Sequence, residues 1–160
     1  MFSREAMGDS ADATVPMGAP VQQFSVFLQN RAGSLEALIR LLHQSRVEML
    51  GFSVQDSRDA TVARIVTSDP EITQQIFLEK GIPHTSSQLV VVALRDPVEE
   101  LQKCLRELHL AETNLDFGYT LLPHPEGRTL VALHVDDVNF AQSVLHKAGI
   151  KTVSQEELSR

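Results

Sequence analysis

The chain has 160 residues, 42% of them hydrophobic, which is enough to bury one ordinary core or two small ones. A formal net charge of −7 without any run of Lys and Arg excludes a general nucleic-acid-binding protein, because a phosphate backbone requires clustered positive charge. The single cysteine, Cys104, excludes an internal disulfide framework, and no apolar run approaches the roughly 20 residues that span a bilayer. We therefore expect a cytoplasmic protein that binds neither nucleic acid nor membranes.

The first 20 residues show neither helical nor strand periodicity. They are rich in Ala, Gly, Asp, Ser and Met. Such a segment buries too little apolar surface to offset the entropy that ordering would cost. We expect residues 1–20 to form a flexible leader.

The stretch 22–42 predicts a strand, a tight turn and a helix. Apolar residues first alternate along the chain and then recur three and four positions apart, at Leu35, Leu38 and Leu42. The first pattern is typical of a strand and the second of one helix face. Gly33 marks the corner, where we expect positive φ or a close backbone approach.

The turn before this helix is a candidate binding site. A helix that begins at Ser34 leaves its first amide N–H groups without partners inside the helix. Those donors and the helix dipole suit an anion such as a carboxylate. The alternative is a well-made loop that Ser34 or Asn30 caps, with no ligand.

The rest of the first half completes a six-element unit. Residues 47–55 and 60–67 alternate on either side of a polar turn, which predicts a hairpin. Residues 68–71 supply a capping side chain, a proline and an acid where a helix begins, and Gly81 ends that helix. Residues 82–87 then form a short fourth strand. The order strand-helix-strand-strand-helix-strand is the ferredoxin-like arrangement.

The same order repeats in the second half of the chain. The matching residues 66 positions apart are Leu28 and Leu94, Leu35 and Leu101, and Leu42 and Leu108. Those 68 positions apart are Asp69 and Asp137, Gly81 and Gly149, and Ile82 and Ile150. The predicted strands of the second half are 88–95, 113–122, 129–135 and 150–153, with helices after Asp96-Pro97 and Asp136-Asp137. A repeat of this length indicates a domain duplication with units 21–87 and 88–160.

The sequence resembles tandem ACT-domain proteins. The segment LQNRAGSL is similar to the family's strand-end turn N-x-x-G-x-L, and TNLDFGY and HKAGIKTVSQEEL resemble later family segments. The opening turn is also similar to the ACT domain of the acetolactate synthase regulatory subunit. The resemblance covers residues 22–158 and implies an α+β fold of two ferredoxin-like (βαββαβ) units. It implies one continuous eight-stranded antiparallel sheet with helices on one face, and regulatory binding of an amino acid between paired units without a cofactor.

The resemblance also implies one binding site, between the first strand–helix turn and the second strand of the second unit. The implied ligand residues are Asn30, Arg31, Ala32, Gly33, Ser34, Asn114 and Asp116. Amides around Gly33 would take the ligand carboxylate, and Asp116 the ammonium. The alternatives are that Asp116 is a solvated strand residue and that Arg31 is a surface arginine. The equivalent second turn, residues 96–99, is acidic and faces Glu48, so it would repel a carboxylate.

No catalytic signature is present in the sequence. It lacks the G-x-S-x-G elbow, the Walker loop, the G-x-G-x-x-G loop and metal-ligand spacing among its six histidines. We expect a protein that is not an enzyme, that senses a small or branched amino acid and that forms a homodimer through exposed sheet edges. Two alternatives stay open: a regulatory subunit of a biosynthetic enzyme such as acetolactate synthase, or a dimerisation module without a ligand.

Overall fold

The structure, a computed structural model, describes residues 18–29, 31–56, 60–123 and 127–160. Its strands are β1 (Val21–Leu28), β2 (Met49–Asp56), β3 (Thr61–Thr67), β4 (His84–Leu94), β5 (Leu115–Thr120), β6 (Thr129–Val135) and β7 (Thr152–Val153). Its helices are α2 (Arg31–Gln44), α3 (Pro70–Lys80), α4 (Pro97–Leu110), α5 (Val138–Lys147) and α6 (Gln155–Ser159). None of the described helices is long and apolar enough to cross a membrane. Most of the expected leader, residues 1–17, lies outside the described residues.

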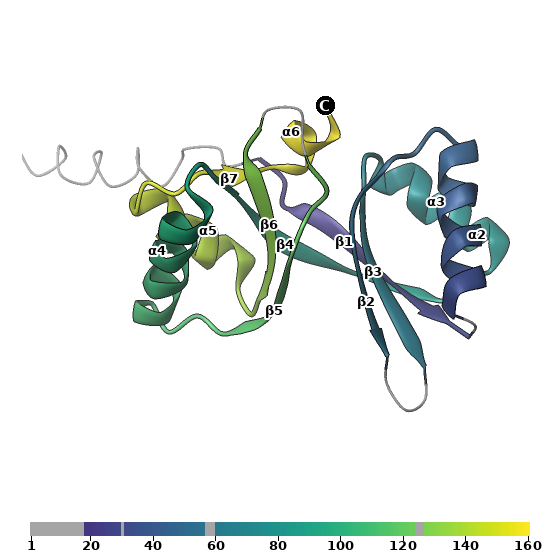
Figure 1. Cartoon of the computed structure of the whole chain (residues 1–160), viewed down its shortest axis with the longest axis horizontal. Helices are drawn as coiled ribbons and strands as arrows, with labels where there is room; N and C mark the ends of the chain where they lie inside the picture. Colours follow the sequence, from purple (N-terminus) through teal and green to yellow (C-terminus); the bar gives the residue numbers. More distant parts are fainter. Residues whose placement is uncertain (1–17, 30, 57–59, 124–126) are drawn as a thin grey trace, which may run out of the picture.

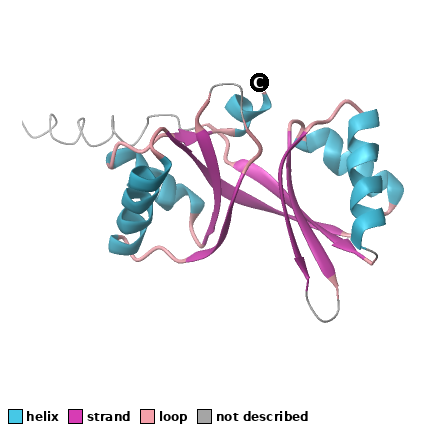
Figure 2. Cartoon of the chain, in the orientation of Figure 1, coloured by secondary structure: helices cyan, strands magenta, loops and turns pink. Residues whose placement is uncertain are grey.

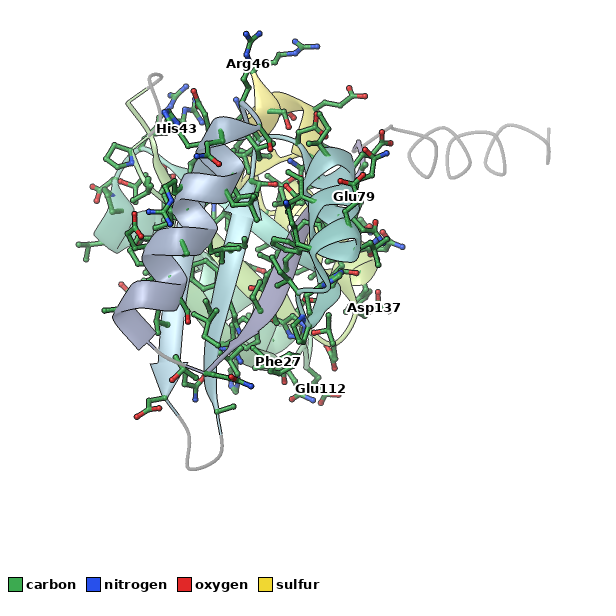
Figure 3. The ribbon with its side chains drawn as sticks, turned by 90° about the vertical axis from the view of Figure 1, so that its right-hand side faces the viewer. Phe27, His43, Arg46, Glu79, Glu112 and Asp137 are labelled. Carbon is green, nitrogen blue, oxygen red and sulfur yellow. The ribbon has the colours of Figure 1, made fainter. Side chains whose placement is uncertain are left out.

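Three helices begin where the sequence predicts. The carboxylates of Asp69, Asp96 and Asp137 each accept a hydrogen bond from the amide three residues later, which caps α3, α4 and α5. The turns that follow the first helix of each unit also match. Arg46 and Glu112, 66 positions apart, adopt positive φ angles of 60° and 55°, and both are labelled in Figure 3. The repeat in the sequence is therefore also a repeat in the backbone.

The first helix begins earlier than the sequence predicts. α2 starts at Arg31, not at Ser34, so Gly33 lies within its first turn. Gly33 has no positive φ, and a Cβ at this position would meet no described residue within 4 Å. The predicted corner at Gly33 is wrong because one glycine costs a helix only about 1 kcal/mol, which is too little to displace its start.

Strand β4 belongs to both halves of the chain. Residues 84–89 pair with β1, whereas residues 90–94 pair with β6 and, in part, with β7. The strand order is β2-β3-β1-β4-β6-β5, with β7 beside β4. The predicted strands 82–87 and 88–95 are thus one strand, and there are seven strands among the described residues instead of eight. No turn residue separates the two predicted strands, so the chain stays extended through the predicted unit boundary.

The four long helices pack on one face of the strands, as the resemblance implies. Phe24 and Ile65 pack with α2 and α3, and Val90 and Leu133 with α4 and α5. The strands twist so strongly that their other face curls on itself and, together with Leu158 of α6, buries a third cluster around Leu89. Figure 1 and Figure 2 show the result, with α2 and α3 at one end of the molecule, α4 and α5 at the other, and the strands between them.

The curled strands approach each other again where the edge strands β2 and β5 meet. The backbone N–H of Leu122 donates to the carbonyl of Leu50 at 2.9 Å. A bulge in β2 lies between Met49 and Gly51. A Cβ on Gly51 would overlap the side chain of Leu121 and lie 3.4 Å from its Cα. The two units are therefore joined through β4 and again at this contact.

Candidate functional site

A strip of polar side chains interrupts the helix-bearing face midway between the two helix pairs. Gln22 on β1 lies opposite Gln88 on β4, and Ser86 lies two residues away on the same face. The apolar neighbours on that face belong to one core at Phe24 and to the other at Val90. No residue that the structure describes hydrogen-bonds to the side chains of Gln22, Ser86 or Gln88, which we call the polar strip.

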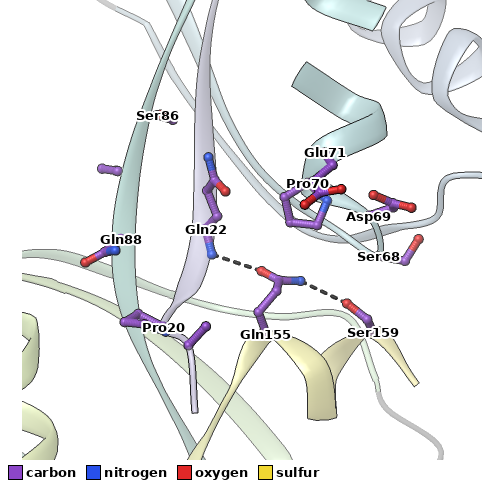
Figure 4. A pocket seen from close by; sticks show the side chains of 12 residues that line it. Pro20, Gln22, Ser68, Asp69, Pro70, Glu71, Ser86, Gln88, Gln155 and Ser159 are labelled. Carbon is purple, nitrogen blue, oxygen red and sulfur yellow. Dashed lines mark hydrogen bonds between the residues drawn. The ribbon is translucent and has the colours of Figure 1, made fainter. Parts of the chain in front are cut away.

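The polar strip forms one wall of a hollow of about 550 Å³, a volume within the usual range for small-molecule sites. Residues 68–71, where α3 begins, form the opposite wall, and Figure 4 shows Gln22 facing Pro70 and Glu71 across the space. The remaining lining residues are Ala19, Pro20, Ser87, Gln155 and Ser159. We call this space the β3–α3 hollow.

Negatively charged side chains lie on only one wall of the β3–α3 hollow. The polar strip offers neutral amide and hydroxyl donors, whereas the opposite wall offers the carboxylates of Asp69 and Glu71. Asp69 accepts from the amide of Ile72 at 3.1 Å, and Pro70 has no N–H, so the amide of Glu71 is left as a donor at this helix start. Among the described lining residues there is no Lys, Arg or His.

The side chain of Gln155 enters the β3–α3 hollow from the C-terminal helix α6. Its Oε1 accepts from the backbone N–H of Gln22 at 2.9 Å, and its Nε2 donates to the carbonyl of Thr67 at 3.2 Å. A capping box between Ser154 and Glu157 holds the start of α6. The lining of this hollow therefore combines residues of the first unit with Gln88, Gln155 and Ser159 of the second.

The second unit has an equivalent hollow of about 450 Å³ at the start of α5, which we call the β6–α5 hollow. It shares Gln88 with the β3–α3 hollow and is also lined by Asp116, His134 and residues 135–139. Nδ1 of His134 donates to the carboxylate of Asp116 at 2.9 Å. With three aspartates along its lining, this hollow is the more acidic of the two.

The two units also meet on the inner face of the strands. The hydroxyl of Tyr119 donates to Oε1 of Gln23 at 2.6 Å, and Gln23 is only 1% exposed. Burial raises the pKa of Tyr119 above its usual value, an effect that the positive charge of Arg64 opposes. The Arg64 guanidinium lies 4.1 Å from the ring centroid of Phe117, which stacks on His134. These contacts link the first unit to the lining of the β6–α5 hollow.

Comparison with known proteins decides the family. The family model described as an ACT domain pair matches residues 19–160. The chain belongs to the ACT domain pair family. The match covers most of the chain and confirms the resemblance drawn from the opening turn and the repeat. No curated protein matches the sequence.

Three solved structures are similar to this ACT pair. Protein BT0572 from Bacteroides thetaiotaomicron has a TM-score of 0.81 at 16% identity, covering 91% of this chain and 99% of that chain. The ligand-free regulatory subunit of aspartate kinase from Thermus thermophilus has a TM-score of 0.54 at 12% identity, covering 81% and 92%. Aspartokinase alpha and beta subunits have a TM-score of 0.53 at 17% identity, covering 80% and 91%. At these identities the likeness shows the fold alone.

The first group of predicted ligand residues lies at the start of α2 in this ACT pair. Ala32 and Gly33 are exposed and Ser34 is half-buried. Asn30 lies outside the described residues, and the side chain of Arg31 is not described either. Ala32, Gly33 and Ser34 thus lie in the first turn of α2, which begins three residues earlier than the sequence predicts.

The second group lies at the start of β5, in the other unit. Asn114 and Asp116 are exposed, and Asp116 lines the β6–α5 hollow. Figure 1 shows the starts of α2 and β5 well apart, in different units. No hydrogen bond or ion pair joins the two groups among the described residues. Within one copy of the ACT pair, the predicted site is therefore not assembled.

The sequence prediction missed the polar strip and Gln155, although both left a signal. Ser86 and Gln88 alternate in register with Val90, so they are polar residues at core-facing positions of a strand. Ser154 and Glu157 have the spacing of a capping box and predict the short helix that carries Gln155. Neither pattern reveals that β1, β4, the start of α3 and the end of the chain meet in space.

Proposed function

We propose that this ACT pair is a regulatory protein, not an enzyme, that binds a free amino acid in the β3–α3 hollow. The observation that carries the proposal is that carboxylates line one wall of that hollow and neutral amide and hydroxyl groups line the other. A free amino acid has a carboxylate and an ammonium group on one carbon, so it matches two walls of opposite character. The lining comes from both units and from α6, so a bound ligand contacts each of them.

In the proposed complex, the ligand carboxylate faces the polar strip and the ammonium faces the carboxylates of Asp69 and Glu71. The side-chain amides of Gln22 and Gln88 are donors for the carboxylate. The described lining residues include two carboxylates and no cationic side chain, which disfavours a ligand that lacks an ammonium group. The sequence led us to expect a small or branched amino acid, whereas the polar lining of this hollow favours a ligand with a polar side chain.

Regulation would follow because a ligand that bridges both units stabilises the arrangement that binds it. Two of the similar structures are named as subunits of aspartate kinase, one of them a regulatory subunit. We infer a homodimer formed through the parts of the edge strands β2 and β5 that lie beyond their mutual contact at Leu50 and Leu122, since each of these strands pairs with one strand among the described residues. The alternative is docking on a biosynthetic enzyme such as acetolactate synthase, which co-purification with a catalytic subunit would reveal.

The predicted site at the start of α2 stays a second proposed location. The amides of Ala32 and Gly33 are at an exposed helix start. Because Asn114 and Asp116 lie in the other unit, a second copy of the chain would have to supply them. This version therefore requires a dimer, whereas the β3–α3 hollow is complete in one copy.

A thermal-shift screen against the common amino acids tests the function and the location together. A ligand at 100 times its dissociation constant adds about 2.7 kcal/mol to the free energy of unfolding, which raises Tm by a few degrees. We expect one amino acid to shift the wild type and Gly33→Glu, and not the double variant Gln22→Ala/Ser86→Ala. Gln75→Ala, at an exposed position of α3 outside the hollow, is the matched control.

Three other outcomes of the screen would contradict this expectation. Loss of the shift in Gly33→Glu and its retention in the double variant would place the ligand at α2. A shift that survives in both variants would contradict both locations. If no amino acid shifts the wild type, the proposed function is wrong.

A further inference from the structure

The carboxamide of Gln155 takes the place of one backbone residue pair at the end of the β1–β3 ladder. The last pair in this ladder is Gln23 opposite Val66, so the next pair along would be Gln22 and Thr67. The backbone N–H of Gln22 and the carbonyl of Thr67 instead bind Oε1 and Nε2 of Gln155, at 2.9 Å and 3.2 Å. One side-chain amide thus bridges a main-chain donor and a main-chain acceptor at the edge of the hollow.

This pair of main-chain groups selects for a carboxamide. A carboxamide has an acceptor and a donor on one carbon, and it satisfies both the N–H of Gln22 and the carbonyl of Thr67. A carboxylate has no donor, so it would leave the Thr67 carbonyl unpaired and place two acceptors against each other. An ammonium group has no acceptor for the Gln22 N–H. We call the space between the N–H of Gln22 and the carbonyl of Thr67 the carboxamide slot. It distinguishes the side chain of glutamine from that of glutamate, although the two are nearly equal in shape.

We propose that the amino acid bound in the β3–α3 hollow carries a side-chain carboxamide, and that Gln155 is a resident competitor that this ligand displaces from the slot. The inference rests on the proposed function, because it assumes that an amino acid enters this hollow. The hollow lies next to the slot, and its polar strip and its carboxylates hold the two charged groups of the ligand.

The side chain of Gln155 can leave the slot without releasing α6. The backbone N–H of Gln155 donates to the carbonyl of Ala19 at 3.0 Å, and Leu158 is buried with 3% exposure. The capping box of Ser154 and Glu157 also holds the helix start without using the Gln155 carboxamide. Only the bonds of the carboxamide itself, including one to Ser159, must break.

Calorimetric titration with L-glutamine and L-glutamate tests the proposal. We expect the wild type to bind L-glutamine at least tenfold more tightly than L-glutamate, because one buried acceptor stays unpaired with the latter. Gln155→Ala removes the competitor and should tighten L-glutamine binding about tenfold. Gln155→Glu keeps an acceptor for the Gln22 N–H and loses the donor to the Thr67 carbonyl. Its affinity for L-glutamine should therefore lie between the affinities of the wild type and of Gln155→Ala. Gln75→Ala, on the surface of α3, should match the wild type.

The outcomes separate this inference from the proposed function. If another amino acid binds in the hollow and L-glutamine does not, the proposed function stands and the carboxamide slot is wrong. Equal affinity for L-glutamine and L-glutamate, or weaker L-glutamine binding in both Gln155 variants, also overturns the inference. Binding of no amino acid at all, in the wild type and in both Gln155 variants, overturns both. Circular dichroism of each variant before titration checks that the fold is intact.

Discussion

The starts of α3 and α5 occupy equivalent positions in the two units but are anchored differently. In the first unit the hydroxyls of Thr67 and Thr73 lie 2.9 Å apart, and Thr73 donates to the carbonyl of Asp69 at 2.7 Å. The residues 68 positions later are Val135 and Ala141, which are buried and have apolar side chains. The start of the second helix is therefore held by hydroxyl hydrogen bonds in the first unit and by apolar packing in the second.

The hydroxyl pair of Thr67 and Thr73 lies beside the larger of the two hollows. A buried hydroxyl pair is directional, so it fixes the start of α3 against β3 more narrowly than apolar packing would. The same residue, Thr67, uses its carbonyl to hold Gln155. The second unit instead completes its hollow with Asp116 and His134. The repeat kept the backbone while the two hollows diverged in chemistry.

The largest effect is expected where the two units touch a second time. Gly51→Val would place a branched side chain where Leu121 already packs. Overpacking a filled site costs about 1–3 kcal/mol, and we expect the upper end because the Leu121 backbone is also close. Urea unfolding should show the loss as a lower midpoint.

Gly33→Ala is the control for this substitution, because a Cβ there meets none of the residues that the structure describes within 4 Å. It lies in the first turn of α2, so alanine should raise the free energy of unfolding by roughly 0.5–1 kcal/mol. Equal losses from Gly51→Val and Gly33→Ala would show that the contact of β2 with Leu121 does not matter.

A pH-dependent difference between the two cores is expected next in size. Cys104 in the second core takes the place that Leu38, 66 positions earlier, has in the first. Burial raises the pKa of the Cys104 thiol from 9.0 to about 11. The neutral thiol thus favours the folded state, and its contribution is complete below pH 9 and falls as the pH rises toward 11.

Wild type and Cys104→Ala should therefore differ in their pH dependence. Between about pH 8 and about pH 10.5 the wild type should lose about 2 kcal/mol more of its free energy of unfolding than the variant. Chemical unfolding at both pH values gives the change in the free energy of unfolding for each protein. The contributions of ionisable groups that both proteins share cancel when the two changes are subtracted. Parallel pH curves would mean that the thiol ionises as readily in the folded chain as in the unfolded one.

The hydroxyl pair of the first unit can be replaced by the apolar pair that the second unit has at the equivalent positions. Thr73→Ala should cost about 1.5 kcal/mol, because the buried hydroxyl of Thr67 loses its partner. Adding Thr67→Val removes that unpaired hydroxyl and copies the second unit, so the double variant should regain most of the loss. Urea unfolding of both single variants and the double variant gives the coupling energy. Additive losses would contradict a shared hydrogen bond.

Local chemistry made much of this fold predictable from sequence. The caps at Asp69, Asp96 and Asp137 were predicted because a carboxylate before a helical pattern acts within three residues. The end of α3 at Gly81 followed from the ease with which glycine adopts a left-handed conformation, here with φ of 65°. The match of α2 to α4 needed only the spacing of leucines.

The parts that failed depend on contacts between distant segments. Nothing local distinguishes one long strand β4 from two strands that meet end to end, so seven strands were read as eight. The β3–α3 hollow combines Gln22, Gln88 and Gln155, whose proximity follows only from the curl of the strands. The role of Asn30 at the start of α2 stays a prediction, because it lies outside the described residues.

The smallest of the expected effects concerns the hydrogen bond that ties the units on the inner face. Tyr119→Phe removes the hydroxyl that donates to Gln23 and should lower the free energy of unfolding by about 1 kcal/mol, since Gln23 is buried. Thr113→Val is the matched control, because the Thr113 hydroxyl is buried without a hydrogen-bond partner in the part of the chain that the structure describes, so its removal should be neutral or stabilising. If urea unfolding gives the same loss for both, the bond between Tyr119 and Gln23 adds nothing beyond the packing of its ring.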